Sequence, residues 1–142
     1  MTDSADPQDP HDLRAFADRL RQAMESADLG LFGAMLHPDV RWGGEQETPE
    51  TCHSRSDVLA WHGRLHAAGV RAHVHEVILR PHAVVLELAL TGPSAGPRGP
   101  RPDRVFQVFR LTDDRIADIR GFPTRDEALS LADRPWQPAQ HR

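Results

Sequence analysis

Four histidines lie close together in the chain, at spacings that raise the question of a metal site. His62 and His66 are four residues apart, so they share one face of a helix, which is a common arrangement of zinc ligands. His73 and His75 follow in a strand, where alternation turns one set of side chains outward. The inward positions of this strand are then Val70, Ala72 and Val74. There is no HExxH motif and no evident third ligand, so we predict a histidine-rich surface or subunit interface, with no metal and no cofactor.

Gln107 and His53 are the candidates for proton-transfer chemistry. Gln107 lies in a mostly apolar strand, and an unpaired buried amide costs about 1–3 kcal/mol. We therefore expect it to meet either a ligand carbonyl or enolate, or another buried polar group. His53 is either a general base or a solvent-exposed histidine, and Glu45 or Glu47 in the preceding loop is an alternative base.

Trp42 and Trp61 are large aromatic residues that could form the walls of a pocket for a ring-shaped ligand. Ordinary core packing is the alternative interpretation. Cys52 is a nucleophile only if a neighbouring base lowers its pKa, and otherwise it is a small buried hydrophobe. The chemistry of these residues therefore depends on where the fold places them.

Composition excludes several classes of function. The chain has 142 residues, 39% of them apolar, which suits one core. Its net charge is −4 and its charges are interspersed, which argues against nucleic acid as a partner. All 17 basic residues are arginine and there is no tyrosine, so Schiff-base and tyrosine chemistry are excluded. The GxxxxGK[ST], GxGxxG and GxSxG motifs are absent.

The same sequence predicts a cytoplasmic protein without a membrane partner. No apolar run approaches the ~20 residues that span a bilayer, and the polar, acidic N-terminus does not resemble a signal peptide. One cysteine allows no internal disulfide, which suits a reducing compartment. We expect a disordered segment over 1–10, one domain over 11–132 and a tail over 133–142 in which Trp136 docks back or meets a partner.

The elements that position these residues follow from periodicity and capping. Helices are expected from Asp9 to 27, from Asp28 to 36, from Ser54 to Gly69 and from Thr124 to 132. Strands are expected over 40–42, 70–79, 83–91, 103–111 and 115–122, with a long turn or hairpin loop over 92–102. The fold class is therefore α+β: three N-terminal helices packed on a curved antiparallel sheet, with a short C-terminal helix.

This order and several local strings resemble the nuclear transport factor 2-like superfamily, in particular its SnoaL-like branch from actinobacteria. The strings are ADL at 27–29, LHPDVRW at 36–42, the segment 54–61, QVF at 107–109 and IRGFPTRDEAL at 119–129. The resemblance implies a cone-shaped, cystatin-like roll with an internal cavity. It also implies a homodimer formed through the outer face of the sheet.

The resemblance indicates which residues face the cavity. The expected ligand-binding residues are Trp42, Trp61, Val105, Gln107, Phe109, Ile119 and Gly121. Gln107 falls where related isomerases place an oxyanion-stabilising residue, and alternation turns Asp118 and Arg120 away from the cavity. The positions of the known catalytic residues are instead occupied by Leu20, Gly44, Leu88, Leu90 and Gly121.

Two functions remain open from the sequence. The first is a binding pocket for a small hydrophobic molecule, without a complete known catalytic set. The second is a cyclase, isomerase or dehydratase that acts by proton transfer on a polyketide- or terpenoid-like ligand, with Gln107 as oxyanion donor and His53, Glu45 or Glu47 as base. Fold resemblance alone does not separate the two, because the superfamily contains both.

Overall fold

The helices begin where capping side chains stop the preceding loop. In the computed structural model they are α1 (Pro10–Ser26), α2 (Leu29–Met35), α3 (Arg55–Ala67) and α4 (Arg125–Ala132). Asp28, Ser54 and Thr124 cap the last three, each accepting a hydrogen bond from a first-turn backbone N–H at 3.0, 3.1 and 3.3 Å, respectively. These predicted caps are confirmed. The structure describes residues 10–44, 46–93, 95–96 and 99–136, so the predicted cap Asp9 and nearly all of the expected disordered segment 1–10 lie outside it.

Gly69 ends α3 as the sequence predicts. Its φ of +95° is in the left-handed region that favours glycine. The N–H of Gly69 donates to the carbonyl of His66, and the N–H of Val70 donates to the carbonyl of Leu65, both at 3.0 Å. This pair of bonds satisfies the last carbonyls of the helix and turns the chain directly into the following strand.

Five strands form one sheet in the order β1-β7-β6-β3-β2. They are β1 (Leu36–Gly43), β2 (Arg71–Arg80), β3 (Ala83–Thr91), β6 (Arg104–Thr112) and β7 (Arg115–Phe122). A small second sheet, β4 (Ala95–Gly96) with β5 (Gly99–Pro100), lies within the expected loop over 92–102. The α+β class with a curved sheet is confirmed, and the antiparallel pairing holds for every strand of the main sheet except β1.

The expectation for β1 was wrong in length and in direction. The strand starts at Leu36 instead of Val40, and it runs parallel to β7. Pro38 misled the prediction, because proline usually ends an element and donates no hydrogen bond. Here β1 is an edge strand and its register shifts between Leu36 and Arg41, so a residue without an N–H is tolerated at that point.

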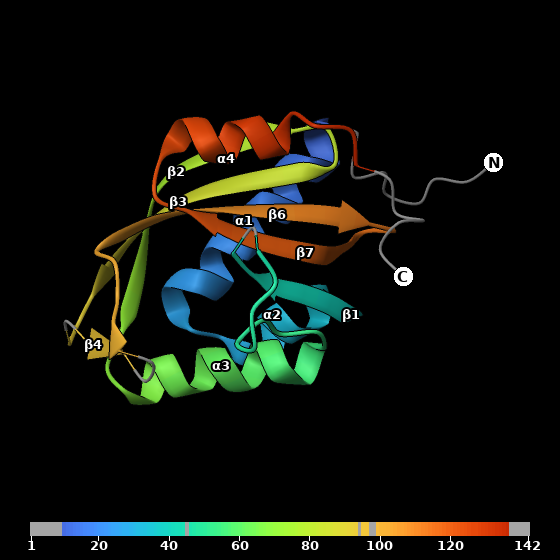
Figure 1. Cartoon of the computed structure of the whole chain (residues 1–142). Coiled ribbons are helices and arrows are strands. Elements are labelled where there is room, and N and C mark those ends of the chain that lie inside the picture. Colours follow the sequence, from blue (N-terminus) through green and yellow to red (C-terminus); the bar gives the residue numbers. More distant parts are fainter. Residues whose placement is uncertain (1–9, 45, 94, 97–98, 137–142) are drawn as a thin grey trace.

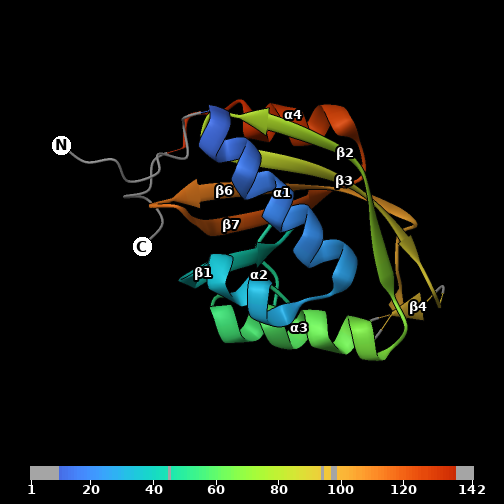
Figure 2. The same ribbon diagram turned by 180° about the vertical axis from the view of Figure 1, so that it is seen from behind.

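The sheet separates two layers of helices (Figures 1 and 2). Helices α1, α2 and α3 lie on its concave side, with α1 crossing in front of the strands and α3 running along the lower edge in Figure 2. Helix α4 covers the opposite face and buries Ala128, Leu131 and Ala132 against Val108 and Phe106. No helix in the described residues is long and apolar enough to cross a membrane.

One carboxylate holds three arginines on the outer face of the sheet. Asp118 is 2% exposed and accepts from Nε and Nη2 of Arg110 at 3.0 and 2.8 Å. Arg120 Nε donates to the same carboxylate at 3.2 Å, and Arg41 Nη1 lies 3.8 Å from it. Burial lowers the pKa of Arg110 and of Arg41, while the charge of Asp118 acts in the opposite direction. The network joins β1, β6 and β7.

Trp136 closes this network from the chain's C-terminal part, so the prediction that it docks back is confirmed. Its Nε1 donates to the carbonyl of Leu111 at 2.9 Å. Its ring lies over the Arg110 guanidinium, 4.2 Å from centroid to carbon, where the π face attracts the cation. Arg110 is thus enclosed between a carboxylate and an aromatic ring.

We predict that Asp118→Asn lowers the free energy of unfolding by about 3 kcal/mol, because it leaves the buried Arg110 without its counter-charge. Urea denaturation at neutral pH measures the change. Asp18→Asn is the matched control, since Asp18 is an exposed residue on α1, and its effect should stay within about 0.5 kcal/mol. Equal stability of the two variants would contradict the role of the network.

Candidate functional site

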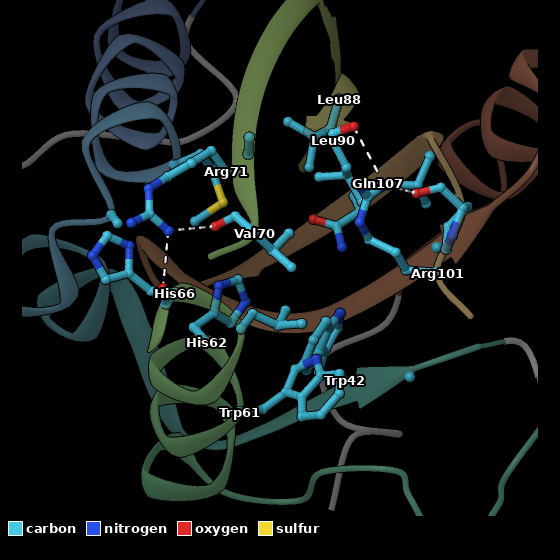
Figure 3. Close-up of a pocket in the computed structure, with 18 of the residues that line it drawn as sticks. Trp42, Trp61, His62, His66, Val70, Arg71, Leu88, Leu90, Arg101 and Gln107 are labelled. Atoms are coloured by element: carbon cyan, nitrogen blue, oxygen red, sulfur yellow. Dashed lines mark hydrogen bonds between the residues drawn. The ribbon is translucent and has the colours of Figure 1, made fainter. Parts of the chain in front are cut away.

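A cavity of about 550 Å³ lies between the concave side of the sheet and helices α1, α2 and α3. This volume is within the ordinary range for small-molecule sites. Apolar side chains dominate its wall, including Met24, Phe32, Leu65, Val70, Leu88 and Leu90. Polar side chains that face it are few, so each of them bears on what the cavity can bind (Figure 3).

Aromatic rings form one wall of the cavity. Trp42 of β1 and Trp61 of α3 pack with ring centroids 5.8 Å apart. The His62 ring lies 4.9 Å from Trp42 and 4.8 Å from Phe32. Trp42 is also fixed through its backbone, because it exchanges two hydrogen bonds with Cys52, of 3.0 and 2.8 Å. The wall therefore consists of rings packed on one another, and it suits the face of a ring-shaped ligand.

His62 is neutral in this wall. Burial lowers the pKa of its imidazole from 6.5 to about 4, because the aromatic surroundings disfavour the charged form. Part of the ring nevertheless remains accessible, since it faces the cavity. Neither ring nitrogen has a hydrogen-bond partner in the described part of the chain. A neutral imidazole can accept or donate one hydrogen bond, so His62 offers the cavity a polar contact without a charge.

Gln107 brings the second polar group into the cavity from the sheet. It is 8% exposed, between the inward-facing Val105 and Phe109 on β6, and pairs with Gly121 of β7. Figure 3 shows its amide directed into the cavity. Among the described residues, no side chain or backbone group bonds this amide. Its NH₂ and carbonyl are thus available to a ligand, which was one of the two alternatives that the sequence left open.

The expected ligand-binding residues divide into two groups. Five of them line the cavity: Trp42, Trp61, Val105, Gln107 and Gly121. The other two, Phe109 and Ile119, are opposite each other on β6 and β7, lie 0% and 1% exposed in the core and do not reach the cavity. They share the inward face, as alternation predicts, but they lie farther along the strands, where the helices fill the space.

His53 and Glu47 do not lie at the cavity. They bond each other at 2.6 Å and are exposed, with side-chain accessibilities of 60% and 59%. Glu47 also lies 3.8 Å from Arg41 Nε. The third candidate base, Glu45, is outside the described residues. The structure therefore does not bring His53 or Glu47 together with Gln107, and Cys52 is buried in the core at 5% exposure.

The four histidines do not gather around one point. His62 turns into the cavity and the exposed His66 also lines it, whereas His73 and His75 are exposed on β2 and do not line it. Nowhere in the described part of the chain do three residues of the types His, Cys, Asp and Glu stand close enough to hold a metal ion. Sequence reasoning missed His62 as a cavity residue, although its position one residue after Trp61 on α3 was a usable signal.

Most positions that carry catalytic groups in the resembled enzymes do face this cavity. Gly44, Leu88, Leu90 and Gly121 are among its lining residues, and Leu20 is buried in the adjoining core. These residues leave the wall apolar. The chemistry of the site therefore depends on His62, Gln107 and the arginines near its mouth.

A curved sheet folded over three helices, with a cavity between them, defines the class of cystatin-like and nuclear transport factor 2-like proteins. The family model of the SnoaL-like domain matches residues 14–119, and the chain belongs to this family. A search of curated proteins finds no significant match.

Solved structures with the same fold come from distant bacteria. A proposed SnoaL-like polyketide cyclase from Jannaschia sp. CCS1 is 16% identical, with a TM-score of 0.62 over 94% of this chain and 100% of that chain. A proposed ketosteroid isomerase from Kribbella flavida is 19% identical, with a TM-score of 0.59 over 88% and 90%. An uncharacterised cystatin-fold protein from Novosphingobium aromaticivorans is 13% identical, with a TM-score of 0.63 over 76% and 95%. At these identities the likeness is one of fold.

The depressed pKa of His62 makes stability depend on pH. As the pH falls, the histidine of the unfolded chain binds a proton near pH 6.5, whereas that of the folded protein binds it only near pH 4. The contribution of His62 to the free energy of unfolding is therefore complete above pH 6.5 and is lost as the pH falls from 6.5 to about 4. We expect this one group to account for on the order of 2–3 kcal/mol across that range. His62→Phe should flatten this part of the profile, measured by urea denaturation at a series of pH values. His75→Phe, at an exposed position of β2 that does not line the cavity, should keep the wild-type slope.

Proposed function

We propose that this protein binds a small hydrophobic molecule in the cavity and has no catalytic set of a known type. Gln107 carries the proposal, because its amide faces a mostly apolar cavity and has no partner among the described residues. A ligand oxygen or N–H can therefore bond this amide in place of water. Trp42 and Trp61 add aromatic surface for rings, with their indole planes 45° apart.

The volume and lining of the cavity and the names of similar structures support one class of ligand. A volume of about 550 Å³ with apolar walls suits a molecule of two to four rings. The names of two similar structures refer to polyketides and ketosteroids, which are molecules of this kind. We propose a polyketide- or terpenoid-like ligand and, from the composition of the sequence, a cytoplasmic location. From the resemblance alone, we propose a homodimer of actinobacterial type that meets through the outer face of the sheet.

The binding proposal predicts that the neutral fluorophore N-phenylnaphthylamine enters the cavity and receives energy from Trp42 and Trp61. Ala72→Phe should weaken its binding at least tenfold, because Ala72 lines the cavity and a phenyl group there fills it. Fluorescence titration measures the dissociation constant. Ala60→Phe, on the exposed face of α3, is the matched control and should bind as the wild type does. Equal binding by the two variants would place the dye elsewhere and contradict the proposal.

A second candidate function is proton transfer, and one observation favours it. His62 is neutral and its ring nitrogens have no partner in the described residues, so it meets the first requirement of a general base. In this mechanism His62 takes a proton from the carbon beside a ligand carbonyl, and the Gln107 amide donates to the developing oxyanion. A pKa of about 4 makes His62 a weak base at neutral pH, which is why binding without turnover is the first proposal.

The two functions are separated by hydrogen exchange. If His62 acts as a base, the protein accelerates deuterium exchange beside the carbonyl of β-tetralone in deuterium oxide, followed by proton NMR. Gln107→Leu should then reduce the rate at least a hundredfold, the usual effect of losing one oxyanion donor. Binding of N-phenylnaphthylamine by the variant serves as the control for an intact cavity. Exchange at the background rate with wild-type protein would rule out this second candidate.

A further inference from the structure

Arg101 is a charged residue in the cavity wall that the proposed function does not use. It follows the β4–β5 hairpin and leads into β6, and its side chain is only 9% exposed. The residue lines the cavity together with Gln107 (Figure 3). A buried guanidinium keeps its positive charge, and such a charge is costly unless something compensates for it.

The bonds of Arg101 hold it in place without neutralising it. Its Nε donates to the carbonyl of Pro93 at 2.7 Å, and its Nη2 donates to that of Gly92 at 2.9 Å. Its Nη1 donates to the carbonyls of Leu90 at 3.3 Å and Pro102 at 3.0 Å. All four acceptors are uncharged. One Nη2 hydrogen is left without an acceptor among the described residues.

Within the described part of the chain, the only carboxylate that reaches Arg101 is that of Asp103, at 3.3 Å. Its side chain is 95% exposed, so water screens its charge. The guanidinium is therefore fixed and buried, and it carries a charge without a buried counter-charge.

The other charged residues of the cavity wall either have a charged partner or are exposed to solvent. Arg104 forms an ion pair with Glu87. Arg71 is exposed and bonds the carbonyls of His66 and Val70. Glu25 accepts from the N–H of Val74 and lies 3.5 Å from Arg21. Glu50, the other acidic residue of the wall, is exposed. Arg101 is thus the one buried charge at the cavity without a charged partner in the interior of the described structure.

We infer that the cavity selects hydrophobic ligands that carry one anionic oxygen group, such as a carboxylate, and that Arg101 recognises this group. The inference rests on the proposed function and names its ligand class more closely. The ring body lies on the wall of Trp42 and Trp61, and the anion accepts from the unoccupied Nη2 hydrogen of Arg101. Gln107, on the strand that Arg101 leads into, supplies a second donor.

Two fluorophores with the same ring body test this inference. Anilinonaphthalene sulfonate carries an anionic group, and N-phenylnaphthylamine is its neutral counterpart. We expect the wild-type protein to bind the sulfonate about tenfold more tightly than the neutral dye, as a charge-assisted hydrogen bond allows. Arg101→Gln should remove this preference, so that the two dyes bind the variant with similar affinity. Arg115→Gln, which removes an exposed arginine on β7, should keep the preference.

The outcomes separate the two proposals. If both dyes bind the wild type with equal affinity, or if Arg101→Gln keeps the preference, the inference is overturned and the binding function stands. If neither dye binds, the proposed function fails and the inference fails with it. Should Arg101→Gln not fold, the wild-type preference is measured at about 0.05 M and about 0.5 M salt. A preference for the anion that survives the higher salt comes from a buried charge, whereas one that disappears comes from the surface and overturns the inference.

Discussion

The helices pack directly against only one part of the inner face of the sheet, and the rest of the structure follows from this constraint. On β6, Phe109 is packed into the core while Val105 and Gln107, nearer the strand's start, line the cavity. On β7 the same change occurs between Ile119 and Gly121. Helices α1 to α3 pack directly on the strands at one end, whereas at the other end the cavity lies between the helices and the sheet. Core and pocket are therefore two parts of one continuous surface.

The outer face of the sheet is covered in a different way, because, of the described helices, only the short α4 packs on it. Helix α4 supplies apolar contacts over one part, and the Asp118 network supplies charged contacts over another. Arg41 joins this network to the site, since its Nη2 donates to the carbonyl of Gly44, in the loop that forms part of the cavity wall. Through an ion pair of 3.8 Å with Arg41, the buried carboxylate on one face of the sheet is thus linked to a loop of the pocket wall.

The chemistry of the cavity lies in its few polar groups. His62 offers a neutral imidazole, Gln107 an amide and Arg101 a fixed positive charge, each from a different element. So few polar groups in an apolar wall select ligands by the position of one or two oxygen atoms. The ring body of the ligand is then recognised only by how well its shape fits the apolar wall. The same arrangement can support proton transfer only if the ligand makes His62 a stronger base, for example when an anion forms beside it.

Local signals in the sequence determined the helix boundaries, the four antiparallel strands and their inward faces. Asp28, Ser54 and Thr124 act through bonds within one turn, and alternation on β6 depends only on the chain itself. The family resemblance added the cavity and most of its wall, including Gln107 and Gly121. The tertiary structure decided the features that depend on how separate elements pack against each other. The edge position of β1 made Pro38 acceptable, and the reach of the helices buried Phe109 and opened Val105 to the cavity. The chain over 46–53 places His53 in solvent, while the packing of α3 turns His62 inward. Residue type alone encodes neither the path of a loop nor the rotation of a helix.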